Sequence, residues 1–211
     1  MSTTTLPLPP AASPAVALPA GTASNTSMTM SGPVGPVSSL PIAFPSRQNA
    51  ALPLERLQEL RFRVEEFHAA YADALDRNDI EAWPAYFTDD AVYRVIARDN
   101  AESNLPLGLM LCDGMGMLKD RAYAIAHTEM FAPRYVQHQV SLVRVLHLQG
   151  DRLFAQANYL IHETTTDEPT RLLQAGKYRD VFRLQGSQLL LEQRDCVFDS
   201  VMVANCLVYP V

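Results

Sequence analysis

The N-terminal part of this 211-residue chain lacks charge, since no Lys, Arg, Asp or Glu occurs before Arg47. Ala, Ser, Thr and Pro dominate there, and ten of the fifteen prolines occur by residue 53. Such a segment buries too little apolar surface to offset the entropy lost on ordering. We therefore predict that residues 1–50 form a disordered, dispensable tail and that residues 51–211 form a single domain. A later start of translation, at Met28 or Met30, is an open alternative.

Long hydrophobic runs are also missing, so no stretch of about 18 apolar residues is available to cross a bilayer as a helix. The formal net charge of −6 offers no basic surface for nucleic acid or an anionic membrane. Three cysteines occur, Cys112, Cys196 and Cys206, without Cys-x-x-Cys spacing. This odd number argues against a disulfide framework and a structural zinc site. Free thiols are typical of a reducing compartment, which predicts a cytoplasmic protein without nucleic-acid or membrane partners.

Metal-binding and nucleotide-binding motifs are absent as well. No Cys-x-His pair occurs, which excludes a Rieske iron–sulfur cluster, and no H-E-x-x-H, G-x-S-x-G, P-loop or G-x-G-x-x-G motif is found. The five histidines are His68, His127, His138, His147 and His162. A two-histidine-one-carboxylate site from His127, His138 and Asp120 lacks a supporting spacing. Surface or hydrogen-bonded histidines are the favoured interpretation, and we predict no catalytic, cofactor-binding or metal-binding residue in this chain.

Helical periodicity begins at Leu54, where apolar residues recur every three or four positions to Leu75 and predict a helix of about six turns. A second, short helix follows, with Asn78 or Asp79 as its N-cap, and delivers Trp83 to the core. Thr88-Asp89-Asp90 is typical of a turn. The strand after it places Tyr93 and Val95 on one face. Residues 98–104 read as a polar loop and residues 115–127 as a further helix.

The last third of the chain has the alternation of β-strands. Strands are expected over residues 140–148, 153–161, 172–184 and 189–199, with a final edge segment at 207–209. Gly176 interrupts the third of them and predicts a bulge. The order of elements predicts an α+β fold, in which helices pack on one side of a curved, mostly antiparallel sheet.

One set of residues carries candidate acid–base chemistry. Tyr178, Asp180 and Phe182 share a face of their strand, and Arg194 lies at the mirrored distance from the turn at Gly186. A carboxylate in an apolar hollow has a raised pKa and suits a general base. A buried ion pair between Asp180 and Arg194 that only fixes strand register is the favoured interpretation. Methionines 110, 115, 117 and 130, near Cys112, are interpreted as core or interface filler rather than redox residues.

Taken together, residues 62–211 resemble the small (beta) subunit of bacterial aromatic-ring-hydroxylating oxygenases, the Rieske non-haem iron enzymes. The order and spacing of several short stretches carry the resemblance. They are Phe67-His68-Ala69-Ala70-Tyr71, residues 83–94, Leu105-Pro106-Leu107, Gly116-Met117-Leu118-Lys119-Asp120-Arg121, Gly176-Lys177-Tyr178-Arg179-Asp180, residues 194–200 and Tyr209-Pro210-Val211. The nearest branch contains the small subunits of salicylate 5-hydroxylase, anthranilate oxygenase and terephthalate oxygenase.

This resemblance implies a cone-shaped, NTF2-like (cystatin-like) α+β fold. It also implies a large (alpha) subunit that carries the Rieske [2Fe-2S] cluster and the mononuclear iron. In such enzymes three small subunits form a trimeric, structural base under three large ones, and ferredoxin and reductase components deliver electrons from NADH. The expected function is thus a non-catalytic beta subunit in aromatic, above all aromatic carboxylate, catabolism.

Two alternatives from other classes share this fold, because a fold does not determine a function. One is a stand-alone dehydratase or isomerase with polar groups in the interior, for which Asp180, Tyr93 and His138 are the candidates. The other is a binding protein for a small aromatic ligand. Spare acid–base groups in the interior would favour the dehydratase or isomerase.

Overall fold

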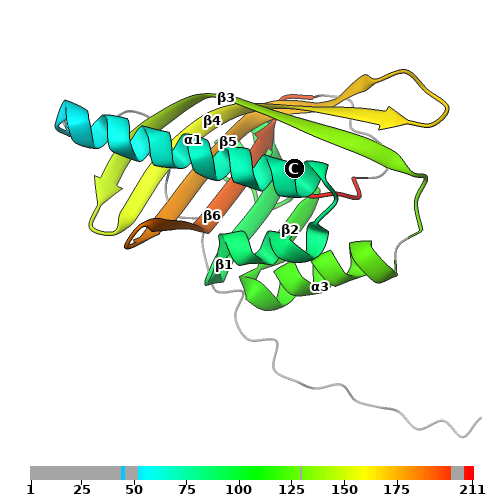
Figure 1. Ribbon diagram of the computed structural model, residues 1–211, viewed down its shortest axis with the longest axis horizontal. Coiled ribbons are helices and arrows are strands. Elements are labelled where there is room, and N and C mark those ends of the chain that lie inside the picture. The colour runs from blue at the N-terminus through cyan, green and yellow to red at the C-terminus, as the bar shows by residue number, and fades with distance from the viewer. Residues whose placement is uncertain (1–43, 46–51, 129, 201–206) are drawn as a thin grey trace, which may run out of the picture. The chain divides into compact units, whose positions relative to one another are not determined.

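The computed structural model describes residues 44–45, 52–128, 130–200 and 207–211. Apart from Phe44 and Pro45, the predicted tail lies outside the described residues. A long helix, a 3-10 helix and a strand come first, followed by two helices that flank a short strand, and then by four long strands (Figure 1). Within the described ranges no helix is both long and apolar enough to span a membrane.

Helix α1 spans Leu54–Asp76, as the apolar repeat predicts. Its buried residues are Leu60, Val64, His68, Tyr71, Ala74 and Leu75. The helix ends at a left-handed turn in which Asn78 has a φ of 61° and donates its backbone N–H to the carbonyl of Leu75, at 2.9 Å. Asn is one of the few residues that tolerate this conformation. Asn78 therefore ends α1.

The 3-10 helix η1 spans Ile80–Tyr86 and buries Trp83 completely. The Trp83 Nε1–H donates to the hydroxyl of Tyr71 at 2.8 Å, which ties η1 to α1. Asp79, one of the two predicted N-cap residues, is the N-cap of η1, but no side chain makes a capping hydrogen bond there. Asn78 lies instead in the turn that ends α1, where its backbone N–H bonds to the Leu75 carbonyl.

Strand β1 spans Phe87–Ala97, and Tyr93 and Val95 are fully buried, as predicted. The predicted turn at residues 88–90 is wrong, since these residues lie within β1. They fall where the pairing of β1 with the last strand is irregular, between Phe87 and Val92. An irregularity of this kind accommodates polar residues without ending the strand.

Helix α2 (Arg98–Glu102) occupies the stretch predicted as a polar loop. Strand β2 (Met110–Asp113) then pairs antiparallel with β1. Helix α3 (Gly114–His127) buries Leu118, Ala122 and Ile125, as predicted. In the sequence, α2, β2 and α3 thus lie between β1 and the four long strands that follow.

The remaining strands are β3 (Arg134–Gln149), β4 (Arg152–Thr165), β5 (Arg171–Gln185) and β6 (Gln188–Phe198). They complete one six-stranded sheet in the order β2-β1-β6-β5-β4-β3. Every neighbouring pair is antiparallel except β1 with β6, which are parallel. The predicted α+β fold with a mostly antiparallel sheet is confirmed.

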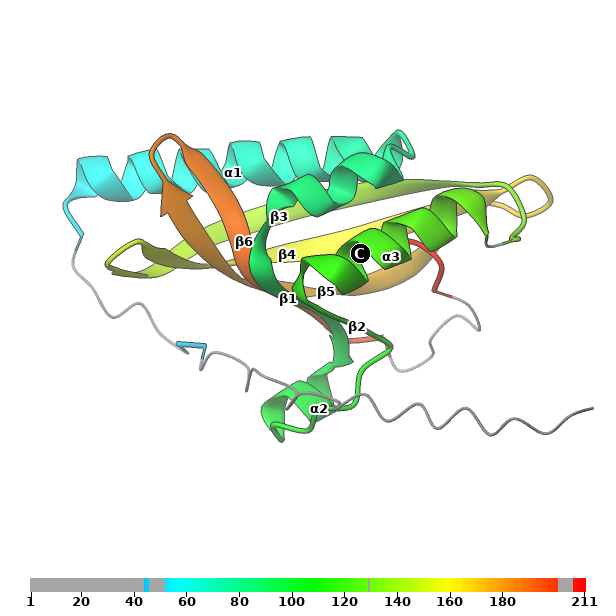
Figure 2. The same ribbon diagram turned by 90° about the horizontal axis from the view of Figure 1, so that it is seen from below.

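The main core lies between one face of this sheet and the helices α1, η1 and α3 (Figures 1 and 2). A smaller cluster of Leu146, Phe154 and Val181 has Phe44 packed against it. The ring of Phe44 contacts that of Phe154 edge to face, with centroids 6.3 Å apart. Phe44 is thus one residue of the predicted tail that contacts the domain.

Gly176 is required for a close approach of strands rather than for the predicted bulge. A Cβ at this position would come within 2.3 Å of the Val197 carbonyl oxygen and 2.8 Å of the Tyr159 hydroxyl. The irregularities of β5 lie elsewhere, opposite Ile161–His162 of β4 and at Val181–Phe182. Glycine at position 176 therefore lets β5 and β6 pair closely under the Tyr159 side chain.

Candidate functional site

The predicted pair of Asp180 and Arg194 is confirmed and forms the centre of the buried polar groups. The two residues are register partners on β5 and β6, and both side chains are fully buried. Arg194 Nε and Nη2 donate to Asp180 Oδ1 and Oδ2 at 2.8 and 2.9 Å. Both carboxylate oxygens are therefore bound in the bidentate geometry that favours arginine over lysine.

His68 of α1 completes this cluster, and the sequence reasoning missed it. Its Nδ1 accepts a hydrogen bond from Arg194 Nη2 at 3.1 Å, so the ring proton is assigned to Nε2. That Nε2 lies 3.4 Å from Asp180 Oδ2. The available signal was the position of His68 on the buried stripe of α1, between Val64 and Tyr71.

Aromatic rings enclose the guanidinium of Arg194 on both sides. Its Cζ lies 4.2 Å from the ring centroids of Tyr71 and of Tyr178. Tyr178 in turn stacks on Tyr159 at 4.4 Å and on His68 at 5.6 Å. A desolvated cation between aromatic faces gains about 2 kcal/mol or more from such contacts.

Burial governs the protonation of this cluster. It raises the pKa of Asp180, an effect that the adjacent Arg194 guanidinium opposes. The Asp180 carboxylate holds the pKa of Arg194 well above its ordinary value, so Arg194 stays charged. Burial, with the Arg194 charge, lowers the pKa of His68 well below 6.5. The cluster is thus a buried ion pair beside a neutral imidazole, in which Arg194 binds both oxygens of Asp180. Two buried nitrogens of the cluster, Arg194 Nη1 and His68 Nε2, have no hydrogen-bond partner among the described residues.

Acidification below about pH 6.5 should destabilise the domain through His68. The folded state keeps this imidazole neutral while the unfolded chain binds a proton, so stability falls as pH falls from 6.5 toward the lowered folded pKa. One such proton contributes up to about 1.4 kcal/mol per pH unit. Denaturant unfolding between about pH 7 and pH 5.5 should therefore show a flatter slope for His68→Gln than for the unsubstituted chain.

His127→Gln is the control, because His127 is almost half exposed, where it contacts Glu81 at 3.1 Å and the ring of Tyr123. It should retain the slope of the unsubstituted chain.

The raised pKa of Asp180 acts in the opposite direction to the lowered pKa of His68, since it favours the folded state on acidification. Equal slopes for the His68 and His127 variants would contradict the assignment.

Tyr93 contacts the C-terminal residues 207–211. Its hydroxyl accepts the backbone N–H of Val211 at 2.7 Å and lies 3.3 Å from the Val211 carbonyl oxygen. Arg121 of α3 donates to the Leu207 and Val208 carbonyls at 3.2 and 2.7 Å. The predicted edge strand at 207–209 is wrong, because these residues form no strand. Tyr93 is therefore engaged in closing the core.

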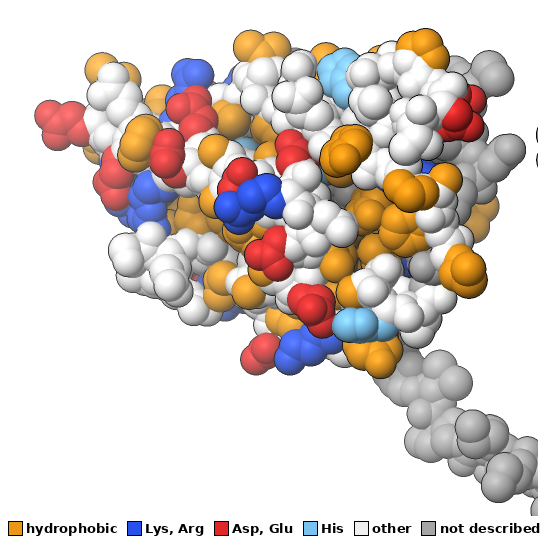
Figure 3. All heavy atoms as spheres, turned by 45° about the vertical axis from the view of Figure 1, so that its right-hand side comes forward, with side chains coloured by type: hydrophobic (Ala, Val, Ile, Leu, Met, Phe, Trp, Pro, Cys, Tyr) orange, Lys and Arg blue, Asp and Glu red, His pale blue; other side chains and the backbone are white. Residues whose placement is uncertain are grey.

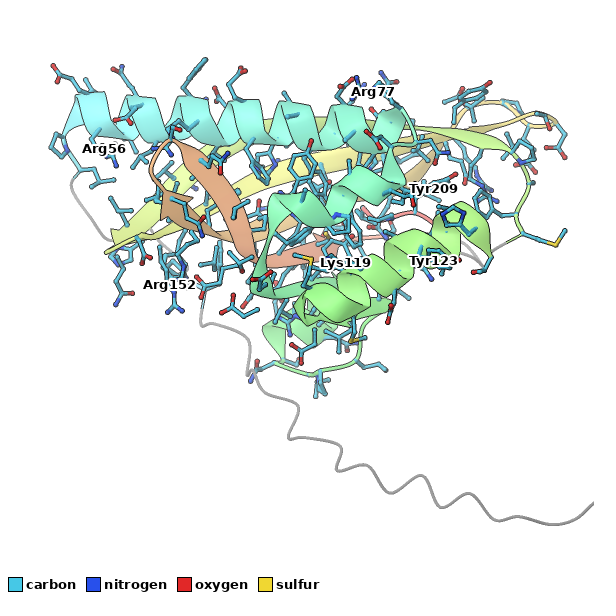
Figure 4. All side chains as sticks on the ribbon, turned by 60° about the horizontal axis from the view of Figure 1, so that its bottom comes forward. Arg56, Arg77, Lys119, Tyr123, Arg152 and Tyr209 are labelled. Atoms are coloured by element: carbon cyan, nitrogen blue, oxygen red, sulfur yellow. The ribbon has the colours of Figure 1, made fainter. Side chains whose placement is uncertain are left out.

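The C-terminal residues 207–211 are part of the core. They are strongly apolar, and Val208, Tyr209 and Val211 are at most 9% exposed, so they do not add an apolar surface to the exterior. Tyr209 lies beside α3, and its ring packs edge to face on Phe131, with centroids 5.4 Å apart (Figure 4). Their hydrophobicity reflects the core that they cover.

The disfavoured alternative, a metal site from His127, His138 and Asp120, is not assembled in the structure. His127 pairs with Glu81, whereas His138 Nδ1 bonds to Asp76 Oδ1 at 2.7 Å. Across the described ranges no three His, Cys, Asp or Glu residues are arranged to hold a metal ion. His138, one of the dehydratase candidates, instead gains a carboxylate partner from the end of α1 that the sequence reasoning did not identify.

The cysteines that the structure describes, Cys112 and Cys196, are buried free thiols. Burial raises the pKa of Cys112 to about 11, which keeps it a thiol, and burial likewise raises the pKa of Cys196. Met110 and Met115 pack against the core, while Met117 and Met130 are exposed. Cys206 lies outside the described residues.

Comparison with known proteins places these features in a family context. Residues 70–205 match the family model of the ring hydroxylating beta subunit. The chain is 25% identical over 150 residues to the anthranilate 1,2-dioxygenase small subunit of Burkholderia cepacia, covering 71% of this chain and 93% of that protein. It is 27% identical over 148 residues to a terephthalate 1,2-dioxygenase beta subunit of a Comamonas species, with coverages of 70% and 96%.

Among solved structures, the beta subunit assigned to an aromatic-ring-hydroxylating dioxygenase of Novosphingobium aromaticivorans is 36% identical in sequence. It superimposes with a TM-score of 0.67 and covers 73% of this chain and 98% of its own. The match therefore includes nearly the whole of that subunit.

Proposed function

Because the chain belongs to the family of ring-hydroxylating beta subunits, we propose that it is a structural, non-catalytic subunit within its enzyme. The enzyme is an aromatic-ring dioxygenase, an oxidoreductase, and the fold is the NTF2-like α+β arrangement implied by the resemblance. The proposed partner is a large subunit that carries the Rieske cluster and the mononuclear iron. Ferredoxin and reductase components deliver electrons to that subunit from NADH, in the cytoplasm.

The observation that carries the structural role is the state of the buried polar groups. Asp180, Arg194 and His68 bond to one another, and Tyr93 bonds to the backbone of Val211. An interior acid or base must have a free atom within reach of a substrate. The hydrogen bonds of Asp180 and Tyr93 support a scaffold and disfavour a dehydratase or isomerase that works through either of these two residues. His138, the third candidate, keeps one ring nitrogen without a partner among the described residues.

The proposed substrates are aromatic carboxylates. Support comes from the relatives, which are small subunits of anthranilate and terephthalate dioxygenases. The large subunit would shape the substrate pocket, so the beta subunit contributes to the reaction through assembly alone.

The proposed assembly contains three small and three large subunits, with the small subunits associated as a trimer. Apolar side chains remain exposed around β2, at one edge of the sheet. They are Leu105, Leu107, Leu109 and Leu111, between 45% and 74% exposed, and Met117 at 46%. On the face shown in Figure 3, hydrophobic side chains (orange) gather mainly in the right-hand part. Exposed apolar groups of this density are typical of interfaces, which supports burial of this edge in the complex.

The test compares the purified chain with the chain purified together with its large subunit. Alone, it should bind no iron by elemental analysis and convert neither anthranilate nor terephthalate. With the large subunit, ferredoxin, reductase and NADH, hydroxylation should appear in a particle of three small and three large subunits, as measured by its mass in solution. A purified chain that converts an aromatic acid unaided would refute the structural role.

A further inference from the structure

A groove of about 470 Å³ lies between α1 and the edge strand β3, and His68 of the Asp180 cluster is among its lining residues. Helix α1 lies along this side of the sheet (Figure 1). Small side chains, Ala69 and Ala72 from the helix and Val140 and Val143 from the strand, contribute an apolar surface. A volume of this size is typical of sites for small molecules.

His138 lines this groove and has one ring nitrogen to spare. The Asp76 carboxylate accepts its Nδ1–H at 2.7 Å and its backbone N–H at 3.1 Å. An ionised carboxylate only accepts, so Nδ1 carries a proton, and in the tautomer with a single ring proton the lone pair lies on Nε2. The side chain is 1% exposed, yet Nε2 has no hydrogen-bond partner among the described residues. A buried acceptor left unpaired destabilises the fold, and a hydrogen bond from a ligand donor would remove this penalty.

The charged residues around the groove favour a donor that carries a positive charge. Three carboxylates line it, from Glu65, Asp73 and Asp76, and neither Lys nor Arg is among its lining residues. Glu65 and Asp73 are paired with arginines of α1, at 2.8 and 3.3 Å, but these pairs are solvent-exposed and weakly held. An anion would meet the carboxylates at the groove wall, whereas a cation with N–H donors would satisfy Nε2 and gain from them.

We propose that this groove binds a primary ammonium group carried on a short apolar body. The ammonium donates to His138 Nε2, Asp76 holds the ring in the accepting tautomer, and the alanine and valine side chains cover the apolar part. The ammonium comes either from a small free amine or from a lysine of the large subunit. Asp180 and the exposed leucines near β2 do not line this site, although His68 of the Asp180 cluster does.

The test is a titration of the full chain, isotopically labelled at histidine, with benzylamine, and separately with benzoate. It is followed by NMR at about pH 8, where the amine is protonated and an ordinary imidazole is neutral. Benzylamine should shift the His138 ring resonances saturably and leave those of His127 in place. Benzoate, which has a similar ring and the opposite charge, should produce no saturable shift.

Two charge-reversal variants at exposed positions of α1 test whether a carboxylate at the groove contributes to binding. Asp73 is 60% exposed at the groove, and Asp73→Lys should weaken benzylamine binding about tenfold or more through like-charge repulsion. Glu66→Lys has the same charge change on the same helix at an exposed position that does not line the groove, and should leave binding nearly unchanged. His138→Phe should abolish the saturable shift of benzylamine's own resonances.

Repeating the titration on the complex with the large subunit separates the two sources. Loss of benzylamine binding there identifies a partner lysine, and retained binding identifies a free amine; both support ammonium recognition. Absence of saturable binding to the free chain, equal binding of benzoate, or equal effects of Asp73→Lys and Glu66→Lys would overturn the proposal.

Discussion

Replacing Asp180 with asparagine is expected to lower the free energy of unfolding by about 3–5 kcal/mol, because it leaves the Arg194 guanidinium buried and uncompensated. Both side chains are inaccessible to water, and the pair makes two hydrogen bonds of 2.8 and 2.9 Å. Chemical denaturation of the purified variant measures the loss, and the yield of complex with the large subunit should fall in parallel. The loss also includes the contribution of His68, because its Nδ1 accepts a hydrogen bond from the same Arg194 guanidinium.

Asp199→Asn is the matched control, because Asp199 pairs with Arg98 at the surface, where the side chains are 40% and 47% exposed. The same change there should cost about 0–1 kcal/mol. A variant at position 180 that is as stable as the unsubstituted chain, in a complex that has nevertheless lost turnover, would contradict the structural role and favour a catalytic one.

Deleting residues 207–211 is expected to destabilise the domain by about 4 kcal/mol or more. The segment buries Val208, Tyr209 and Val211, and fully burying a valine-sized side chain contributes about 1.5–3 kcal/mol. Removal also leaves the Tyr93 hydroxyl without the backbone group that it binds at 2.7 Å. Thermal unfolding and the yield of folded protein measure the change.

Tyr93→Phe tests the same contact in a chain that retains the segment. It removes only the hydroxyl and leaves the buried N–H of Val211 without that acceptor, at a cost of about 1–3 kcal/mol. Leu207→Ala, at a half-buried position, should cost less than either change. A deletion variant with unaltered stability would show that these residues cover the core without holding it together.

The helices and strands were largely predictable because their hydrophobic periods are long. Helix α1 and the alternating strand β4 follow the sequence pattern closely. Errors occurred where a local polar signal was overruled by pairing, as at Thr88, whose hydroxyl bonds to Asp90 at 2.8 Å inside β1. Residue types such as Thr and Asp favour a turn locally, but the hydrogen bonds of the sheet outweighed that preference here.

The buried polar cluster was only half predictable. Asp180 and Arg194 are symmetric about a hairpin turn, so counting residues from Gly186 brings them together. His68 lies 126 positions from Arg194, and Asp76 lies 62 positions from His138. Such contacts depend on how α1 crosses the sheet, and no local spacing encodes that crossing.

The parallel pairing of β1 with β6 sets the order in which the chain can fold during synthesis. Arg94 and Asp195, joined across these strands by two bonds of 2.7 Å, are 101 positions apart. Contacts of such long range pay the entropy of closing the intervening loop before they gain anything, so they form late and slowly. On the ribosome, β1 and the hairpin partner β2 emerge early and must wait for β6 with one backbone edge unpaired. An incomplete nascent chain therefore presents an open strand edge, the feature most prone to self-association, until its last strand has been made.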